Sequence, residues 1–136
     1  MVKRTHNSER ETGFTLLELM VVMIIIATLA ALAVPAYRAQ VRKAQEAVLR
    51  EDLLVMRQAI DQFTVDKQKA PQSLDDLVQA GYLKAIPKDP FTQRSDTWVV
   101  QQSSDYSSVD QTDTGTIDVH SGSQEISSDN VPYTQW

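Results

Sequence analysis

Glu18 is the residue whose type and position most directly suggest chemistry. It is the one charged residue between Phe14 and Ala36, a stretch that is otherwise almost wholly apolar. A carboxylate at the centre of a membrane-spanning segment costs about 2.5–3.5 kcal/mol on insertion scales, and less near its end. Glu18 lies five residues into the stretch, so it could reach the membrane interface, or it could pair with a cation of a neighbouring chain. The residue types alone leave both interpretations open.

A second group of candidate residues lies in the C-terminal part of the chain. No Lys or Arg follows Arg94, whereas seven acidic residues do, and the net charge of the whole chain is −5. Such a surface repels phosphates, so we expect no nucleic-acid partner. The acidic residues form a solvated face, or some of them hold a hard cation. The chain has no Cys, which excludes disulfides and thiolate metal sites.

A hydrolase interpretation fails on geometry. Asp118, His120 and Ser121 have the residue types of a catalytic triad, but near neighbours at one strand end cannot converge on each other as that chemistry requires. Residues 70–136 offer no other set of convergent titratable groups. We therefore predict that the protein is not an enzyme.

The element that positions Glu18 is a long helix. Residues 14–36 are enough to span a bilayer, which takes about 20 helical residues. A cleaved secretory signal is the competitor, but no small-residue cleavage pattern follows the stretch. With no Gly between residues 14 and 69, the pattern predicts one helix over 15–66, about 80 Å long. Pro35 should bend or locally open it, because proline removes one backbone hydrogen bond.

The second half of this helix is amphipathic. Apolar residues recur at spacings of three and four in two stripes, one from Tyr37 to Val48 and a slightly rotated one from Leu49 to Phe63. The other faces carry residues spaced for i,i+4 ion pairs. These pairs are Arg42–Glu46, Glu46–Arg50 and Arg57–Asp61.

The remaining residues predict a small α+β head packed on the helix. Ala70-Pro71 ends the long helix, and Ser73 followed by Asp76 is typical of a capping box that starts a short helix. Gly81 suits the position just past that helix. Residues 97–100 and 116–119 are strand-like and are expected to pair as a small antiparallel sheet.

The start of the apolar stretch resembles the N-terminal signature of type IV pilins and pseudopilins. The matching residues are Gly13-Phe14-Thr15-Leu16-Leu17-Glu18-Leu19-Met20, and Pro35 falls where that family has a helix proline. The resemblance implies that a prepilin peptidase cuts between Gly13 and Phe14 on the cytoplasmic side, and that Phe14 is then N-methylated. It implies that Glu18 neutralises the Phe14 ammonium of an adjacent subunit. A buried carboxylate is stabilised by an equally buried cation, so this pair would set the axial register.

The resemblance also implies a division of the chain. Residues 1–13 would be a cleaved cytoplasmic leader, and residues 14–36 the transmembrane and filament-core half of the helix. Residues 37–136 would be a soluble pilin-like head that includes the amphipathic half-helix 37–68. The protein would cross the bacterial inner membrane once, with a cytoplasmic N-terminus and a periplasmic head, before it enters an envelope filament.

Residues 70–92 narrow the resemblance to the major pseudopilins of type II secretion, through Ala70-Pro71-Gln72-Ser73-Leu74-Asp75-Asp76-Leu77-Val78 and Ile86-Pro87-Lys88-Asp89-Pro90-Phe91. This implies a structural subunit that polymerises with itself into a periplasmic pseudopilus. Its other partners would be prepilin peptidase, minor pseudopilins and the inner-membrane assembly platform. Two alternatives stay open: a major or minor pilin of a surface pilus for adhesion, motility or DNA uptake, and a membrane-tethered enzyme or binding module.

Pseudopilins of this kind fold their C-terminal region around calcium. By that resemblance, the candidate ligands here are Asp118, Glu125, Asp129 and Asn130, because a hard cation needs six to eight oxygens. The tail has fewer acidic residues than the family pattern, and Ser123 stands where an acidic ligand is expected. The alternative is a loop held by the packing of aromatic residues near the C-terminus.

Overall fold

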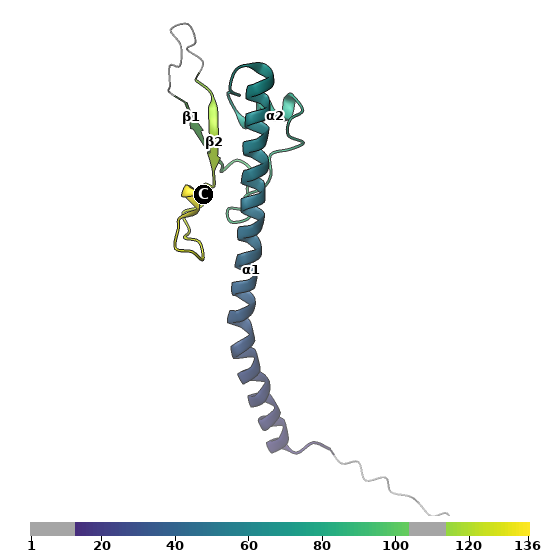
Figure 1. Ribbon diagram of the computed structural model, residues 1–136. Helices are drawn as coiled ribbons and strands as arrows, with labels where there is room; N and C mark the ends of the chain where they lie inside the picture. Colours follow the sequence, from purple (N-terminus) through teal and green to yellow (C-terminus); the bar gives the residue numbers. More distant parts are fainter. Residues whose placement is uncertain (1–12, 104–113) are drawn as a thin grey trace, which may run out of the picture. The chain divides into compact units, whose positions relative to one another are not determined.

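A computed structural model describes residues 13–103 and 114–136 of the chain. Its elements are α1 (Leu16–Lys67), α2 (Leu74–Gln79), β1 (Val99–Gln102), β2 (Thr116–His120) and the 3-10 turn η1 (Tyr133–Gln135) (Figure 1). The predicted α+β class is confirmed, with one long N-terminal helix, one short helix and a two-stranded antiparallel sheet.

Local backbone features mark both ends of helix α1: a side-chain cap at its start and a left-handed residue after its end. At its start the Thr15 side-chain oxygen accepts a hydrogen bond of 3.2 Å from the backbone N–H of Glu18, which is the geometry of an N-cap. The helix includes Pro35 and continues beyond it to Lys67. It ends at Lys67 because Gln68 takes a left-handed conformation, with φ of +55°.

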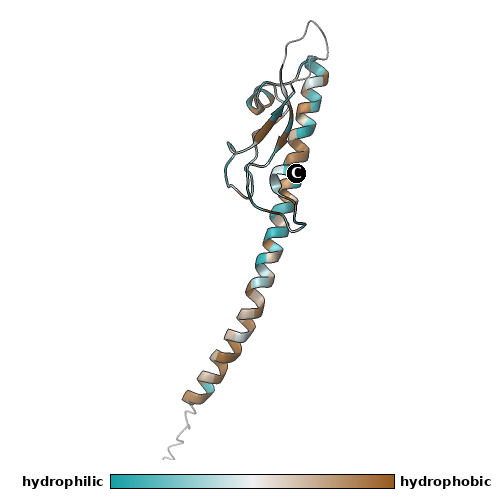
Figure 2. Cartoon of the chain, turned by 90° about the vertical axis from the view of Figure 1, so that its left-hand side faces the viewer, coloured by the Kyte–Doolittle hydropathy of each residue, from teal (hydrophilic) through white to brown (hydrophobic). Residues whose placement is uncertain are grey.

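The chain divides into two compact units, Met1–Ala39 and Gln40–Trp136, and α1 contributes to both. Of the predicted leader, residues 1–13, only Gly13 is among the described residues. In the first unit the α1 residues are almost all apolar, whereas polar and apolar residues alternate along α1 in the second unit (Figure 2). The difference matches the predicted apolar and amphipathic halves of the helix.

The core of the second unit is the rotated apolar stripe of α1 packed against the head. Its buried α1 residues are Leu49, Leu53, Met56, Ala59, Ile60 and Phe63, and those of the head are Leu74, Leu77, Leu83, Trp98, Val119 and Tyr133. The more N-terminal stripe behaves differently, because Tyr37, Val41 and Val48 remain exposed. Burial of α1 side chains within this chain therefore starts near Glu46 and Leu49.

Local signals place the elements of the head. The predicted capping box of α2 is confirmed, with Ser73 and Asp76 bonded to each other's backbone N–H, and Gly81 follows with φ of +81°. Strands β1 and β2 pair antiparallel, with Val100 opposite Val119. Strand β1 begins two residues later than predicted. Trp98 instead lies in the core, where its indole N–H donates to the Pro87 carbonyl at 2.8 Å.

Candidate functional site

The N-terminal candidate residues, Gly13, Phe14, Glu18 and Pro35, lie at the start of α1 or within it, in a stretch that no other described part of the chain packs against. Every described residue from 13 to 41 is exposed, and Phe14 is 85% exposed. By length and composition, α1 is able to cross a membrane. Since this apolar surface is not buried in the chain, it must be covered by lipid or by other chains.

Glu18 and Gly13 have no role in holding the described chain together, apart from the helix start. No ion pair to Glu18 forms among the described residues. A Cβ added to Gly13 would meet no atom within 4 Å, so packing does not require glycine there. Packing and ion pairs among the described residues therefore account for neither residue type.

The spacing of Thr15 and Glu18 carries a second function that sequence reasoning missed. Thr-x-x-Glu is the capping-box pattern, and Thr15 does cap α1 through the Glu18 N–H. A carboxylate in the first helical turn also interacts favourably with the helix dipole. The motif itself was the signal that could have revealed this role.

A second candidate site is a cluster of polar side chains where the C-terminal segment meets α1. Its centre is a buried carboxylate on α1, that of Glu46. Glu46 is 4% exposed, although its spacing placed it on a polar face. It accepts hydrogen bonds from the Ser128 N–H at 2.7 Å, the Ser128 hydroxyl at 2.6 Å and the Tyr133 hydroxyl at 2.9 Å. Arg42 lies beside it, with 3.9 Å between Nε and Oε1. Glu46 thus ties α1 to residues more than 80 positions away.

Its environment makes the Glu46 carboxyl a stronger acid. Burial alone would raise its pKa, but the hydrogen bonds from Ser128 and Tyr133 and the charge of Arg42 outweigh burial, and the pKa lies below its ordinary value. Burial, and then the neighbouring Glu46, raise the pKa of the Tyr133 hydroxyl. Both shifts keep Glu46 charged and Tyr133 protonated, which is the state that their hydrogen bond needs.

The stabilisation by Glu46 should consequently depend on pH. Its pKa is lower in the folded than in the unfolded chain, so its contribution is present above the unfolded value of about 4.3 and is lost as pH falls through the folded value. In detergent micelles at neutral pH, we expect Glu46→Gln to have a lower melting temperature than the wild type. The difference between the two melting temperatures should narrow in acid. A difference that stays constant across that range would contradict this account.

Arg57 binds the first of the predicted calcium ligands. Its Nε lies 2.6 Å from Oδ1 of Asp118, and its Nη2 donates to the backbone oxygens of Val119 at 3.0 Å and Trp136 at 2.7 Å. Burial would raise the pKa of Asp118, but the Arg57 hydrogen bond, the Val119 N–H and the nearby charges lower it overall. Arg57 thus joins β2 and the C-terminal residue to α1.

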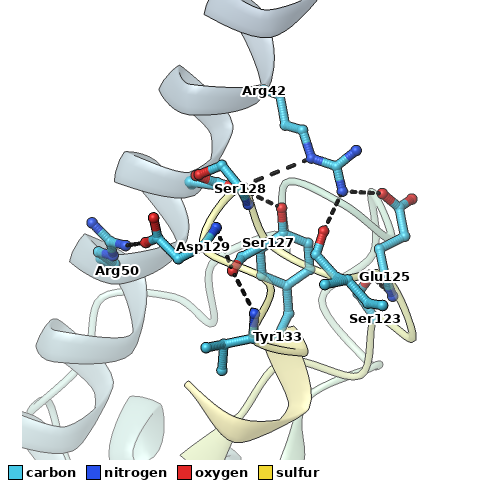
Figure 3. Close-up of polar contacts among 11 residues, drawn as sticks. Arg42, Arg50, Ser123, Glu125, Ser127, Ser128, Asp129 and Tyr133 are labelled. Atoms are coloured by element: carbon cyan, nitrogen blue, oxygen red, sulfur yellow. Dashed lines mark hydrogen bonds and ion pairs between the residues drawn. The ribbon is translucent and has the colours of Figure 1, made fainter.

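Two further arginines of α1 reach the other predicted carboxylates, as Figure 3 shows. Arg42 Nη2 lies 3.3 Å from Oε2 of Glu125, and Arg50 Nη2 lies 3.3 Å from Oδ2 of Asp129. Asn130, the fourth predicted ligand, forms a left-handed turn with φ of +60°. The four residues are therefore not gathered around one point; each carboxylate faces a different arginine.

Only one of the three predicted i,i+4 pairs forms among the described residues, the long Arg42–Glu46 contact. Arg50 and Arg57 turn to Asp129 and Asp118 instead. These longer-range partners are the residues assigned above to calcium.

The donor set fits calcium poorly. In the part of the chain that the structure describes, no group of three or more His, Asp or Glu side chains is arranged to hold a metal ion. No buried side-chain oxygen or nitrogen there lacks a hydrogen-bond partner. Ser123, which stands where an acidic ligand was expected, is buried, and its hydroxyl accepts from the Glu125 N–H at 3.3 Å.

We expect Arg57 and Asp118 to be energetically coupled. In a double-mutant cycle of Arg57→Gln and Asp118→Asn, each single change should lower the free energy of unfolding. The double change should lower it by less than the sum of the two single effects. The coupling should be about 0.5–3 kcal/mol, because the two side chains are in direct contact and partly buried. Denaturant unfolding in micelles measures it. The exposed pair Arg94 and Asp96 provides the comparison, and coupling near zero at Arg57–Asp118 would contradict the contact.

A second buried carboxylate was also missed by sequence reasoning. Asp89 is 0% exposed and accepts hydrogen bonds from the Phe91 N–H at 2.8 Å, the Thr92 N–H at 3.3 Å and the Ser121 hydroxyl. Through the Phe91 and Thr92 N–H groups the carboxylate holds the turn that follows Asp89. It fixes this loop to the residue that follows β2.

Comparison with known proteins agrees with the geometry of the helix. Residues 10–34 match the model of the prokaryotic N-terminal methylation motif. The chain is 33% identical over 125 residues to the type II secretion system core protein G of Vibrio cholerae serotype O1, covering 81% of this chain and 78% of that protein. It is 30% identical over 142 aligned positions to the protein of the same name from Klebsiella michiganensis, covering 93% and 89%.

The similarity continues beyond the apolar helix. The core protein G of Escherichia coli K12 is 34% identical over 100 residues, covering 62% of this chain and 69% of that protein. No solved structure matches the chain at the same level of significance. The matched motif places the chain among proteins that carry a prokaryotic N-terminal methylation motif. Within that class, the chain belongs to the family of type II secretion system core protein G.

Proposed function

We propose that this chain is a structural pseudopilin, which prepilin peptidase processes and which polymerises into a periplasmic pseudopilus for type II secretion. The observation that carries the proposal is the coincidence of two facts at one place. Residues 10–34 match the N-terminal methylation motif, and the same segment is an apolar half-helix that the chain leaves uncovered. The names of the relatives point to the same machine.

The processing step acts at Gly13 and Phe14. Cleavage between them creates a new amino group on Phe14 that is N-methylated, and the helix stays attached to the head. Before assembly, α1 anchors the subunit in the inner membrane with the head in the periplasm. The peptidase therefore meets its substrate on the cytoplasmic side.

The assembly step uses Glu18. As a subunit leaves the membrane, its Glu18 carboxylate pairs with the Phe14 ammonium of an adjacent subunit. An unpaired charge in an apolar filament core is costly, so the correct axial stagger is favoured over the others. Pro35 gives the helix a place where it is short of one hydrogen bond and can bend or unwind in the filament.

The partners are then other copies of this chain, prepilin peptidase, minor pseudopilins and the inner-membrane assembly platform. The head takes no part in catalysis in this proposal; it forms the filament surface. A membrane-tethered enzyme would need a polar cleft with convergent titratable groups.

Gene deletion with complementation tests the proposal. Deleting the gene should leave exported enzymes in the periplasm, and the wild-type gene should restore them to the medium while surface pili are unaffected. Loss of pili with intact secretion would assign the chain to a surface pilus instead. Normal secretion and normal pili in the deletion strain would refute both filament functions.

A further inference from the structure

We propose that the C-terminal segment of the head, residues 118–136, is held to α1 by protein side chains alone, in place of the calcium ion that the family resemblance implies. We name these contacts the Glu46 lock. It consists of Glu46, Arg42, Arg50 and Arg57 of α1 together with Asp118, Glu125, Ser128, Asp129 and Tyr133 of the segment.

The Glu46 carboxylate on α1 holds the C-terminal segment in place, as a bound cation holds a calcium-binding loop. Calcium cross-links a loop by gathering its oxygens. Here a buried anion gathers donors instead, the N–H and hydroxyl of Ser128 and the hydroxyl of Tyr133, at 2.6–2.9 Å. Tyr133 is fully buried and stacks on Phe91 with 4.1 Å between ring centroids. Tyr133 thus fixes the segment in two ways: its hydroxyl bonds to Glu46 and its ring packs on Phe91.

The three arginines take the oxygens that a calcium site would need. Arg42 binds Glu125 (Figure 3) and also the backbone oxygen of Ile126, at 2.5 Å. Arg57 binds the backbone oxygen of Val119 besides Asp118. Calcium loops use carboxylate and carbonyl oxygens of this kind. A guanidinium already supplies the positive charge, and it repels a further cation at short range.

Serine hydroxyls complete the backbone turns of the segment. The Ser121 oxygen accepts from the Ser123 N–H at 3.1 Å, and the Ser127 oxygen accepts from the Asp129 and Val131 N–H groups at 3.2 Å each. These are neutral oxygens that are already occupied by internal hydrogen bonds. Affinity for a hard cation grows with the number of charged ligands, so this set is a weak one.

Arg50 adds contacts to two further residues of the C-terminal segment, Asp129 and Trp136. Its guanidinium lies 4.4 Å from the centroid of the Trp136 ring and pairs with Asp129. The packing of Tyr133 and Trp136, with 5.1 Å between centroids, agrees with the aromatic alternative to calcium. Ser123, which stands where the resemblance implies an acidic ligand, is buried in the same segment.

The first arm of the test measures calcium directly. Full-length protein in detergent micelles, stripped of metal, is melted with EDTA, with CaCl2 at about 5 mM or with MgCl2 at the same concentration, which exceeds the dissociation constants of weak extracellular calcium sites. We expect the same melting temperature in all three. A rise of several degrees with calcium but not magnesium would overturn the proposal, because a ligand that binds only the folded state must stabilise it.

The second arm removes the lock. Glu46→Gln should lower the melting temperature by about 5–15 °C and speed hydrogen exchange in residues 121–136, and calcium should not restore either. Tyr133→Phe, which removes one donor and keeps the ring, should shift both in the same direction by less. Glu51→Gln is the matched control, since Glu51 is exposed on the same helix. Equal behaviour of all three variants, or rescue by calcium, would overturn the proposal.

Discussion

Replacing Glu18 with alanine should leave the protein in the membrane and abolish filament assembly. Insertion does not need the carboxylate, because an apolar segment inserts more readily without a charge. In the proposed pairing assembly does need it, because the Phe14 ammonium of the neighbouring subunit would otherwise enter the filament core unpaired. We expect a normal amount of processed subunit in the membrane fraction, no filaments by electron microscopy and no secretion.

Two further variants separate the charge from the helix cap. Glu18→Gln keeps a side chain that can complete a capping box with Thr15, but it has no charge, so it should fail as alanine does. Glu18→Asp keeps the charge on a shorter side chain and should retain part of the assembly. Normal filaments from the alanine or glutamine variant would refute the register role. Assembly by glutamine but not by alanine would assign Glu18 to the cap.

Replacing Gly13 with leucine should block maturation completely while the head folds as before. A Cβ at this position meets no atom within 4 Å, so the change has no packing cost. In the proposed processing step, it is the peptidase that requires a small residue before the cut. We expect the variant to migrate as the longer precursor, to carry no methylated Phe14 and to be absent from filaments.

Gly81 provides the matched control for this experiment. Its φ of +81° is unfavourable for other residues, so Gly81→Ala should destabilise the head by about 1–2 kcal/mol. Processing at Gly13 should continue normally. The two glycine variants should thus give opposite results. Gly13→Leu should lose maturation without losing stability, and Gly81→Ala should lose stability without a maturation defect. Normal processing of Gly13→Leu would contradict the assigned cutting point.

Much of the fold could be predicted because its signals are local. The apolar stretch and the rotated stripe that starts at Leu49 predicted α1, and Ser73 with Asp76 predicted the start of α2. Strand β1 was misplaced by two residues because Trp98 looks strand-like, yet its side chain is held by the core and by Pro87. Residues such as Tyr37 and Val48 fit the helical period without being buried in this chain.

The polar site could not be predicted in the same way. Helical spacing offers Arg50 and Arg57 partners one turn away, but the tertiary fold brings Asp129 and Asp118 within reach instead. Glu46 looked like one member of a surface ion pair, and its burial depends on Ser128 and Tyr133, which lie 82 and 87 residues further along. The residue types drew attention to Asp118, Glu125 and Asp129, but they could not predict that each carboxylate lies against an arginine of α1.

The most direct test of the central claim is mass spectrometry of the mature N-terminus. The claim is that the chain is a prepilin whose apolar helix survives processing and becomes the assembly element. The account predicts a protein that begins at Phe14 and carries one additional methyl group on its amino nitrogen. An unprocessed chain that begins at Met1, or one cut after the apolar stretch, would contradict it.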